Sequence, residues 1–69
     1  MKLSARNVFK GTVKAIEVGA MNVDVFVEIA PGIEVSSIIT KNSSEKLVLE
    51  VGKEVFVVIK ASNVMVGVE

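Results

Sequence analysis

Side chains alternate with a period of two in the middle of the chain. One face of this stretch carries Val23, Val25, Val27 and Ile29, and the other carries Asn22, Asp24, Phe26 and Glu28. This spacing predicts a β-strand over residues 23–30 with one face turned to a core. Fifteen Val and six Ile stand against three Phe and no Tyr or Trp. Branched aliphatic side chains favour strands, so the whole chain is predicted to be all-β.

The rest of the chain divides into short strands separated by turn residues. Further strands are predicted over residues 8–18, 33–39, 54–61 and 64–68, with turns at residues 19–22, 31–32, 51–53 and 62–63. In the first strand the alternation slips around Gly11 and again between Val13 and Ile16. A glycine and a phase slip inside a strand predict a bulge or a sharp bend.

One segment breaks the strand rhythm. Residues 41–47 contain no β-branched side chain, and Thr40 and Ser43 are both plausible N-caps. A short helix or helical turn is therefore expected between the third and fourth strands. This order of elements is that of the OB-fold, a five-stranded, partly open Greek-key barrel. We expect residues 1–69 to form one such domain.

Chain length and composition indicate self-association. A 69-residue domain buries little surface, and with no Cys and no His it has neither disulfides nor the usual transition-metal ligands. Yet 51% of the residues are hydrophobic, and residues 55–59 are apolar on both strand faces. We expect one of those faces to lie in the core and the other against another copy of the chain.

Several function classes are disfavoured. The formal net charge is zero and the only aromatic residues are three Phe, which argues against a nucleic-acid-binding OB domain. Catalysis is not expected, because His, Cys and Tyr are absent and the acidic residues are scattered. No apolar run is long enough to span a membrane, and residues 1–7 lack the apolar region of a signal peptide, so a cytoplasmic location is expected.

The polar groups that remain are hydrogen-bond donors suited to an anion. They are Ser4, Arg6, Thr40, Ser43, Lys60 and Ser62. Arg6, the only arginine, is a permanently charged planar donor. Four of these residues also have an ordinary structural interpretation. Arg6 belongs to a solvent-exposed segment before the first strand, Thr40 and Ser43 cap a helix, and Lys60 is a charged residue that follows an aggregation-prone apolar strand.

The joint arrangement of these residues resembles the molbindins, the small molybdate-binding Mop proteins of bacteria, over nearly all 69 residues. The resemblance rests on Ser4-Ala5-Arg6-Asn7, Gly11-Thr12-Val13 with Ile16, Gly19-Ala20-Met21-Asn22, Ile39-Thr40-x-x-Ser43 and Ile59-Lys60-Ala61-Ser62. It implies a homohexamer, a trimer of dimers, that holds oxyanions between subunits for intracellular molybdenum storage or homeostasis. No metal ion would be bound directly, because the molybdenum arrives as molybdate.

The resemblance also implies which residues bind. One chain would supply Ser4, Ala5, Arg6, Lys60, Ala61 and Ser62, and a neighbouring chain would supply Thr40 and Ser43. Gly19, Ala20 and Asn22 are candidates for a second oxyanion site. Tungstate, with the same charge and shape as molybdate, is expected to bind as well. Two alternatives stay open: a molybdopterin carrier and a molybdate-sensing module that binds another protein.

Overall fold

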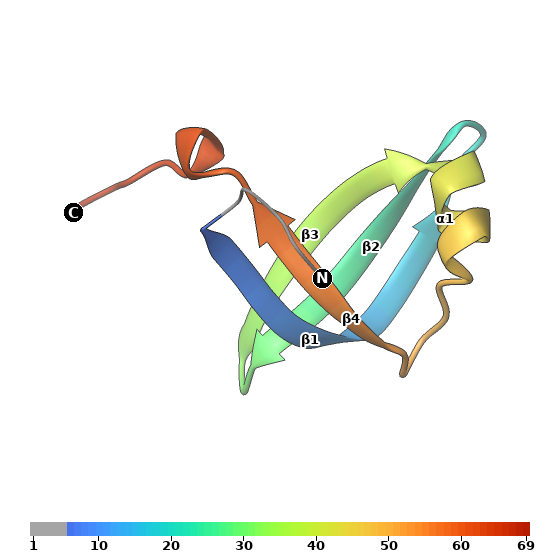
Figure 1. The fold of residues 1–69 in the computed structure, drawn as a ribbon, viewed down its shortest axis with the longest axis horizontal. Coiled ribbons are helices and arrows are strands. Elements are labelled where there is room, and N and C mark those ends of the chain that lie inside the picture. Colours follow the sequence, from blue (N-terminus) through green and yellow to red (C-terminus); the bar gives the residue numbers. More distant parts are fainter. Residues whose placement is uncertain (1–5) are drawn as a thin grey trace.

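The computed structural model describes residues 6–69 and confirms the all-β prediction (Figure 1). Four antiparallel strands form one sheet in the order β3-β2-β1-β4. The elements in chain order are β1 (Asn7–Val18), β2 (Asn22–Ala30), β3 (Ile33–Thr40), α1 (Lys41–Leu47), β4 (Glu54–Ile59) and the 3-10 helix η1 (Ala61–Asn63).

Strand β1 organises the sheet because it pairs with a different neighbour along each half. Residues 7–12 pair with β4, and residues 12–18 pair with β2. The predicted irregularity is confirmed as a shift in register between Val13 and Ala15. Gly11 is buried beside β2, where a Cβ atom would lie 2.6 Å from Val27 Cγ1 and 2.8 Å from the Glu28 carbonyl oxygen. The glycine is needed here because the backbone of β2 approaches so closely.

The core is small and built from valines. Val13, Val23, Val25 and Val27 are the buried hydrophobic residues, which confirms the alternation predicted for β2. Ile39 on β3 and Val55 and Val57 on β4 pack against this cluster but are only partly buried. The core is therefore closed at the middle strands and incompletely covered at the two edge strands.

The predicted helix is confirmed over residues 41–47, with Thr40 as its N-cap. The helix ends at Leu47, and the left-handed conformation of its C-cap Val48 (φ 52°) lets the Val48 N–H reach the Glu45 carbonyl. Lys53 Nζ also donates to the carbonyl oxygens of Leu47 at 2.6 Å and Val48 at 3.0 Å. These contacts satisfy carbonyls that the short helix leaves unpaired.

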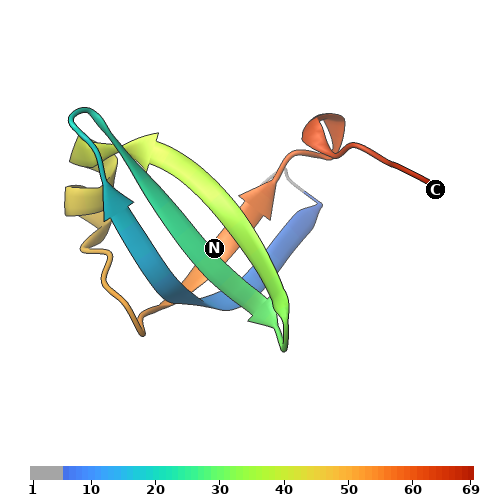
Figure 2. The ribbon, with the colours of Figure 1, turned by 180° about the vertical axis from the view of Figure 1, so that it is seen from behind.

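The prediction of a fifth strand is not confirmed in the single chain. Residues 64–69, here called the C-terminal segment, form no strand, and β4 ends at Ile59 rather than at residue 61. The segment leaves the sheet through η1 and points away from it (Figure 2). The strands described within residues 6–69 thus form an open sheet, not a five-stranded barrel. Alternating apolar side chains indicate strand propensity, but the backbone N–H and C=O groups of a strand also need a neighbouring strand to pair with. The C-terminal segment has no such neighbour within reach.

Candidate functional site

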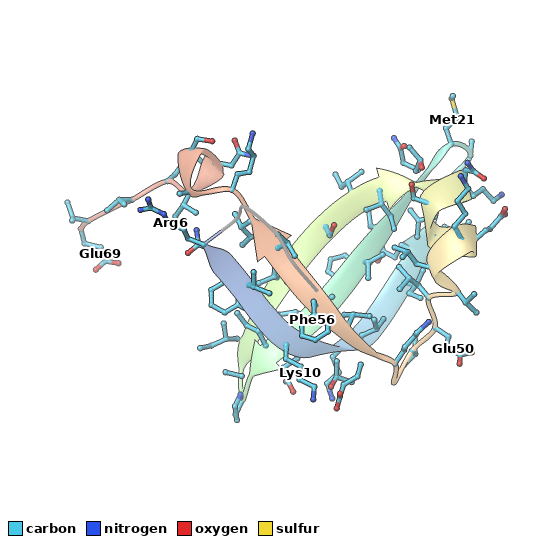
Figure 3. The ribbon with its side chains drawn as sticks, in the orientation of Figure 1. Arg6, Lys10, Met21, Glu50, Phe56 and Glu69 are labelled. Atoms are coloured by element: carbon cyan, nitrogen blue, oxygen red, sulfur yellow. The ribbon has the colours of Figure 1, made fainter. Side chains whose placement is uncertain are left out.

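The strand register places Arg6 beside Lys60. Asn7 is paired with Ile59, and Asn7 Nδ2 donates to the Ile59 carbonyl oxygen at 3.2 Å. Arg6 and Lys60 are the next residues on the two strands, so their backbones lie across from each other. Figure 3 shows the Arg6 side chain at the same end of the molecule as η1. Sequence reasoning gave Asn7 no role of its own, but its side chain fixes this end of the β1–β4 pair.

The Lys60–Ser62 segment forms a tight turn next to Arg6. The Asn63 N–H donates to the Lys60 carbonyl at 2.9 Å, and the Val64 N–H donates to the Ala61 carbonyl at 3.3 Å. Lys60, Ala61 and Ser62 are all exposed, as is Arg6. Predicted site residues from two distant parts of the sequence therefore meet at one end of the sheet. Ser4 and Ala5 lie outside the described residues.

Two cations, Arg6 and Lys60, lie at this end of the sheet. Within residues 6–69 the ion pairs are Lys10 with Glu54, at 2.9 Å, and Lys14 with Glu28, at 3.8 Å. Neither pair involves Arg6 or Lys60, so among the described residues both cations keep their donors for a ligand. Two adjacent cations with exposed amide and hydroxyl donors form an arrangement that suits a small dianion.

Thr40 and Ser43 lie together at the start of α1. Thr40 Oγ1 accepts from the Ser43 N–H at 3.1 Å and donates to Ser43 Oγ at 2.8 Å. The capping interpretation of Thr40 is therefore confirmed. Because the Thr40 hydroxyl donates to Ser43 Oγ, the Ser43 hydroxyl proton can point elsewhere.

The two groups of donors do not meet in one chain. Helix α1, with Thr40 and Ser43, lies at one end of the sheet, and η1, with its neighbour Arg6, lies at the other (Figures 1 and 3). One copy of the chain therefore cannot assemble all the predicted oxyanion ligands around one ion.

The second-site candidates Gly19, Ala20 and Asn22 lie in the turn between β1 and β2. The Gly19 N–H donates to the Asn22 carbonyl at 2.8 Å, and the Met21 carbonyl accepts from the Lys41 N–H at 3.0 Å. This turn is thus joined to the first residue of α1. An open hollow beside it is lined by Glu17, Val18, Gly19, Ala20, Met21, Asn22 and Asp24.

Two carboxylates line that hollow, which sequence reasoning did not foresee. Glu17 and Asp24 are cross-strand partners flanking the turn. Their spacing around residues 19–22 was the available signal, since paired positions of a hairpin share one face. Carboxylates repel an anion, so this turn needs positive charge from elsewhere to hold one.

Two other kinds of site are not found among the described residues. Residues 6–69 contain no group of three or more acidic side chains placed to hold a metal ion. In the same part of the chain, no helix combines the length and apolarity needed to cross a membrane.

Comparison with known proteins identifies the family of the chain. A family model, the TOBE domain, matches residues 3–66. A probable molybdenum-pterin-binding protein of Haemophilus influenzae is 49% identical over 69 residues, which cover 100% of both chains. The solved structure of MopII from Clostridium pasteurianum superposes with a TM-score of 0.91 at 37% identity, covering 97% of this chain and 100% of that one.

A third relative was solved with its ligand. The molybdate-bound structure of the cytoplasmic molybdate-binding protein ModG matches with a TM-score of 0.83 and 48% identity, over 88% of this chain and 43% of that chain. The chain therefore belongs to the TOBE-domain family, and its full-length likeness to the Haemophilus protein and to MopII places it in the Mop, or molbindin, group of that family.

Proposed function

We propose that this protein binds molybdate between the subunits of a homo-oligomer and holds molybdenum in the cytoplasm. The observation that carries the proposal is the meeting of Arg6 and Lys60 at one end of the sheet, away from the hydroxyls of α1. The names of the Haemophilus protein and of ModG, which mention molybdenum-pterin and molybdate, support the choice of ligand. We propose a binding role for residues 1–69 as one domain, and no catalytic role.

The donor set fits the chemistry of molybdate. Molybdate is a tetrahedral dianion whose oxygens accept hydrogen bonds and donate none. Arg6 and Lys60 together would neutralise its two charges, and Ser62, Thr40 and Ser43 would donate from hydroxyl groups. Phosphate at neutral pH still carries a proton, and a site made only of donors offers that O–H no acceptor. Leaving a buried polar group unpaired costs roughly 1–3 kcal/mol, so phosphate should bind more weakly than molybdate. Sulfate must be rejected by size, and tungstate should bind.

The separation of the donors implies that two chains make one site. In the proposed site one chain provides Ser4, Ala5, Arg6, Lys60, Ala61 and Ser62, and its neighbour provides Thr40 and Ser43. The proposed assembly is a hexamer built as a trimer of dimers. The outer face of β4 supports association, because Phe56 and Val58 are large apolar side chains that the single chain leaves exposed. A ligand held between chains stabilises only the assembled state.

Two other roles are distinguished by what binds. A molybdopterin carrier needs a planar aromatic slot, and the chain has no Tyr or Trp to build one. Stoichiometric uptake of free molybdate by pterin-free protein would favour the proposed function over this one. If the protein is instead a sensing module, a pull-down should recover a transporter or regulator, and the amount recovered should change with molybdate.

The test compares Arg6→Ala with Lys10→Ala by titration calorimetry and native mass spectrometry. Both variants lose one positive charge, but Lys10 is paired with Glu54 away from the proposed site. Hydrogen bonds to charged groups are worth about 1.5–3 kcal/mol, so Arg6→Ala should weaken molybdate binding roughly 10- to 150-fold. Lys10→Ala should bind as the wild type does.

The same titrations can contradict the proposal at two levels. Unchanged binding in Arg6→Ala would refute the assignment of the site. A wild-type protein that takes up neither molybdate nor tungstate would refute the function itself. Sulfate and phosphate serve as the competing oxyanions, and both should bind more weakly than molybdate.

A further inference from the structure

Helix α1 carries proposed oxyanion ligands, but no buried apolar face holds it to the sheet. Thr40 is its N-cap and Ser43 lies in its first turn. None of the residues 41–47 is buried, and Leu47 is 57% exposed. The helix has 7 residues, whereas isolated helices shorter than about 12–15 residues are marginal in water. Contacts at its two ends must therefore keep it folded.

The N-terminal end of α1 is fixed by the sheet. Thr40 is the last residue of β3 and is paired with Asn22 on β2. The Lys41 N–H donates to the Met21 carbonyl oxygen at 3.0 Å. Strand pairing thus places Thr40 whether or not the helix is formed. Ser43 is different, because its position depends on the first helical turn.

The C-terminal end of α1 is held by one ammonium group. Lys53 Nζ donates to the Leu47 carbonyl oxygen at 2.6 Å and to the Val48 carbonyl oxygen at 3.0 Å. Val48 has the left-handed conformation, and its carbonyl and that of Leu47 lie within reach of the same cation. A positive charge at this end also interacts favourably with the helix dipole.

Lys53 is in turn anchored to the centre of the core. Its carbonyl oxygen accepts from the Val13 N–H at 2.9 Å, and the Gly52 N–H donates to the Val13 carbonyl oxygen at 2.8 Å. Val13 is 0% exposed, and Lys53 itself is half-buried. The segment that joins α1 to β4 is therefore fixed to β1 just where the lysine side chain reaches back to the helix (Figure 1).

We propose that Lys53 is a positioning residue for the oxyanion site, and that it keeps α1 folded so that Ser43 can donate to the ligand. The inference rests on the proposed function, in which α1 serves a site completed by a neighbouring chain. The Thr40 hydroxyl donates to Ser43 Oγ, which leaves the Ser43 proton for the oxyanion. Without the ammonium, the last turn of α1 opens, and helix cooperativity carries the opening to the first turn.

A matched pair of variants tests the role of this lysine. Lys53→Met and Lys46→Met each remove one positive charge, and Lys46 is an exposed residue in the last turn of the same helix. Titration calorimetry with molybdate should show binding about three- to tenfold weaker for Lys53→Met, because the Ser43 hydrogen bond is weakened rather than removed. Lys46→Met should bind as the wild type does. Equal affinities of the two variants would overturn the inference.

A double-mutant cycle shows whether Lys53 acts through Ser43 or through general stability. In a Ser43→Ala background the hydroxyl donor is already lost, so adding Lys53→Met should change the affinity little. A residue that merely stabilises the domain would lower the affinity by the same factor in both backgrounds. Additive losses would therefore overturn the inference.

Amide hydrogen exchange in the full chain reports on the helix directly. The Val48 N–H donates to the Glu45 carbonyl at 3.1 Å, and the Leu49 N–H donates to the Ser44 carbonyl at 3.2 Å. Both amides should exchange faster in Lys53→Met than in the wild type, while the amides of the central strand β2 keep their protection. Unchanged exchange at these two amides would overturn the inference even if the affinity fell.

The outcomes separate this inference from the proposed function. A wild-type protein that binds molybdate, together with a Lys53→Met variant of equal affinity, would refute the role of Lys53 and leave the function standing. A wild-type protein that takes up no molybdate would refute the function, and the positioning role with it.

Discussion

Replacing Gly11 with alanine adds one methyl group where the structure has no room for it. The new Cβ would lie 2.6 Å from Val27 Cγ1, 2.8 Å from the Glu28 carbonyl oxygen and 3.2 Å from Ile29 Cγ2. Nonbonded carbon atoms prefer a separation of about 3.5–4.0 Å. The valine is buried and the carbonyl belongs to a sheet ladder, so neither neighbour can move aside cheaply.

The size of the effect follows from two opposing contributions. Overpacking a core costs about 1–3 kcal/mol. Replacing glycine restricts the unfolded chain and returns about 0.4–1 kcal/mol. We therefore expect Gly11→Ala to lower the free energy of unfolding by about 1–2 kcal/mol. For a domain of this size that corresponds to a fall in Tm of about 4–16 °C.

The assay is thermal unfolding followed by circular dichroism at one protein concentration, since the stability of an oligomer depends on concentration. A double-mutant cycle with Val27→Ala supplies the control. Removing Val27 Cγ1 relieves the shortest contact, so Gly11→Ala should cost less in that background, with a coupling energy of about 0.5–2 kcal/mol. A Tm for Gly11→Ala at or above that of the wild type would refute the reasoning.

Two further predictions concern the ends of α1. Thr40→Ala removes the oxygen that accepts from the Ser43 N–H and should lower the free energy of unfolding by about 0.5–2 kcal/mol. Thr40→Ser keeps a hydroxyl oxygen at this position and should keep the stability. Equal denaturant midpoints for the two variants would contradict the capping role of Thr40. Val48→Gly removes a β-branched residue from the left-handed region and should raise stability by about 0.5–1 kcal/mol in the same assay. Lys46→Gly, inside the helix, should instead cost about 1 kcal/mol, and a loss of stability in both would contradict the account of Val48.

Much of the fold could be predicted from local patterns. The alternation from Val23 to Ile29 identified β2 and three of the four buried valines, since a period of two places one face in the core. The capping residue Thr40 located the start of α1, because its side chain satisfies a free N–H group of the first helical turn. The irregularity in β1 followed from Gly11 and the phase slip beyond it.

The candidate site was predicted less completely. The residues that suit an oxyanion could be chosen by donor chemistry and by family resemblance, since both depend on residue type and order. Their grouping was implied by the resemblance alone and could not be worked out from donor chemistry, because it depends on register: the Asn7–Ile59 pair brings Arg6 to Lys60, and the length of the sheet keeps both from Thr40. The carboxylates of Glu17 and Asp24 at the second candidate site likewise became evident only through hairpin pairing.

The sequence by itself determined the strand-forming segments, the helix caps and the donors offered to an anion, because these depend on the side chains of near neighbours. Only the tertiary structure decided that residues 64–68, with the same alternation as β2, stay unpaired in their own chain. A strand is completed by backbone groups distant in sequence, and the turn at η1 carries the segment away from them.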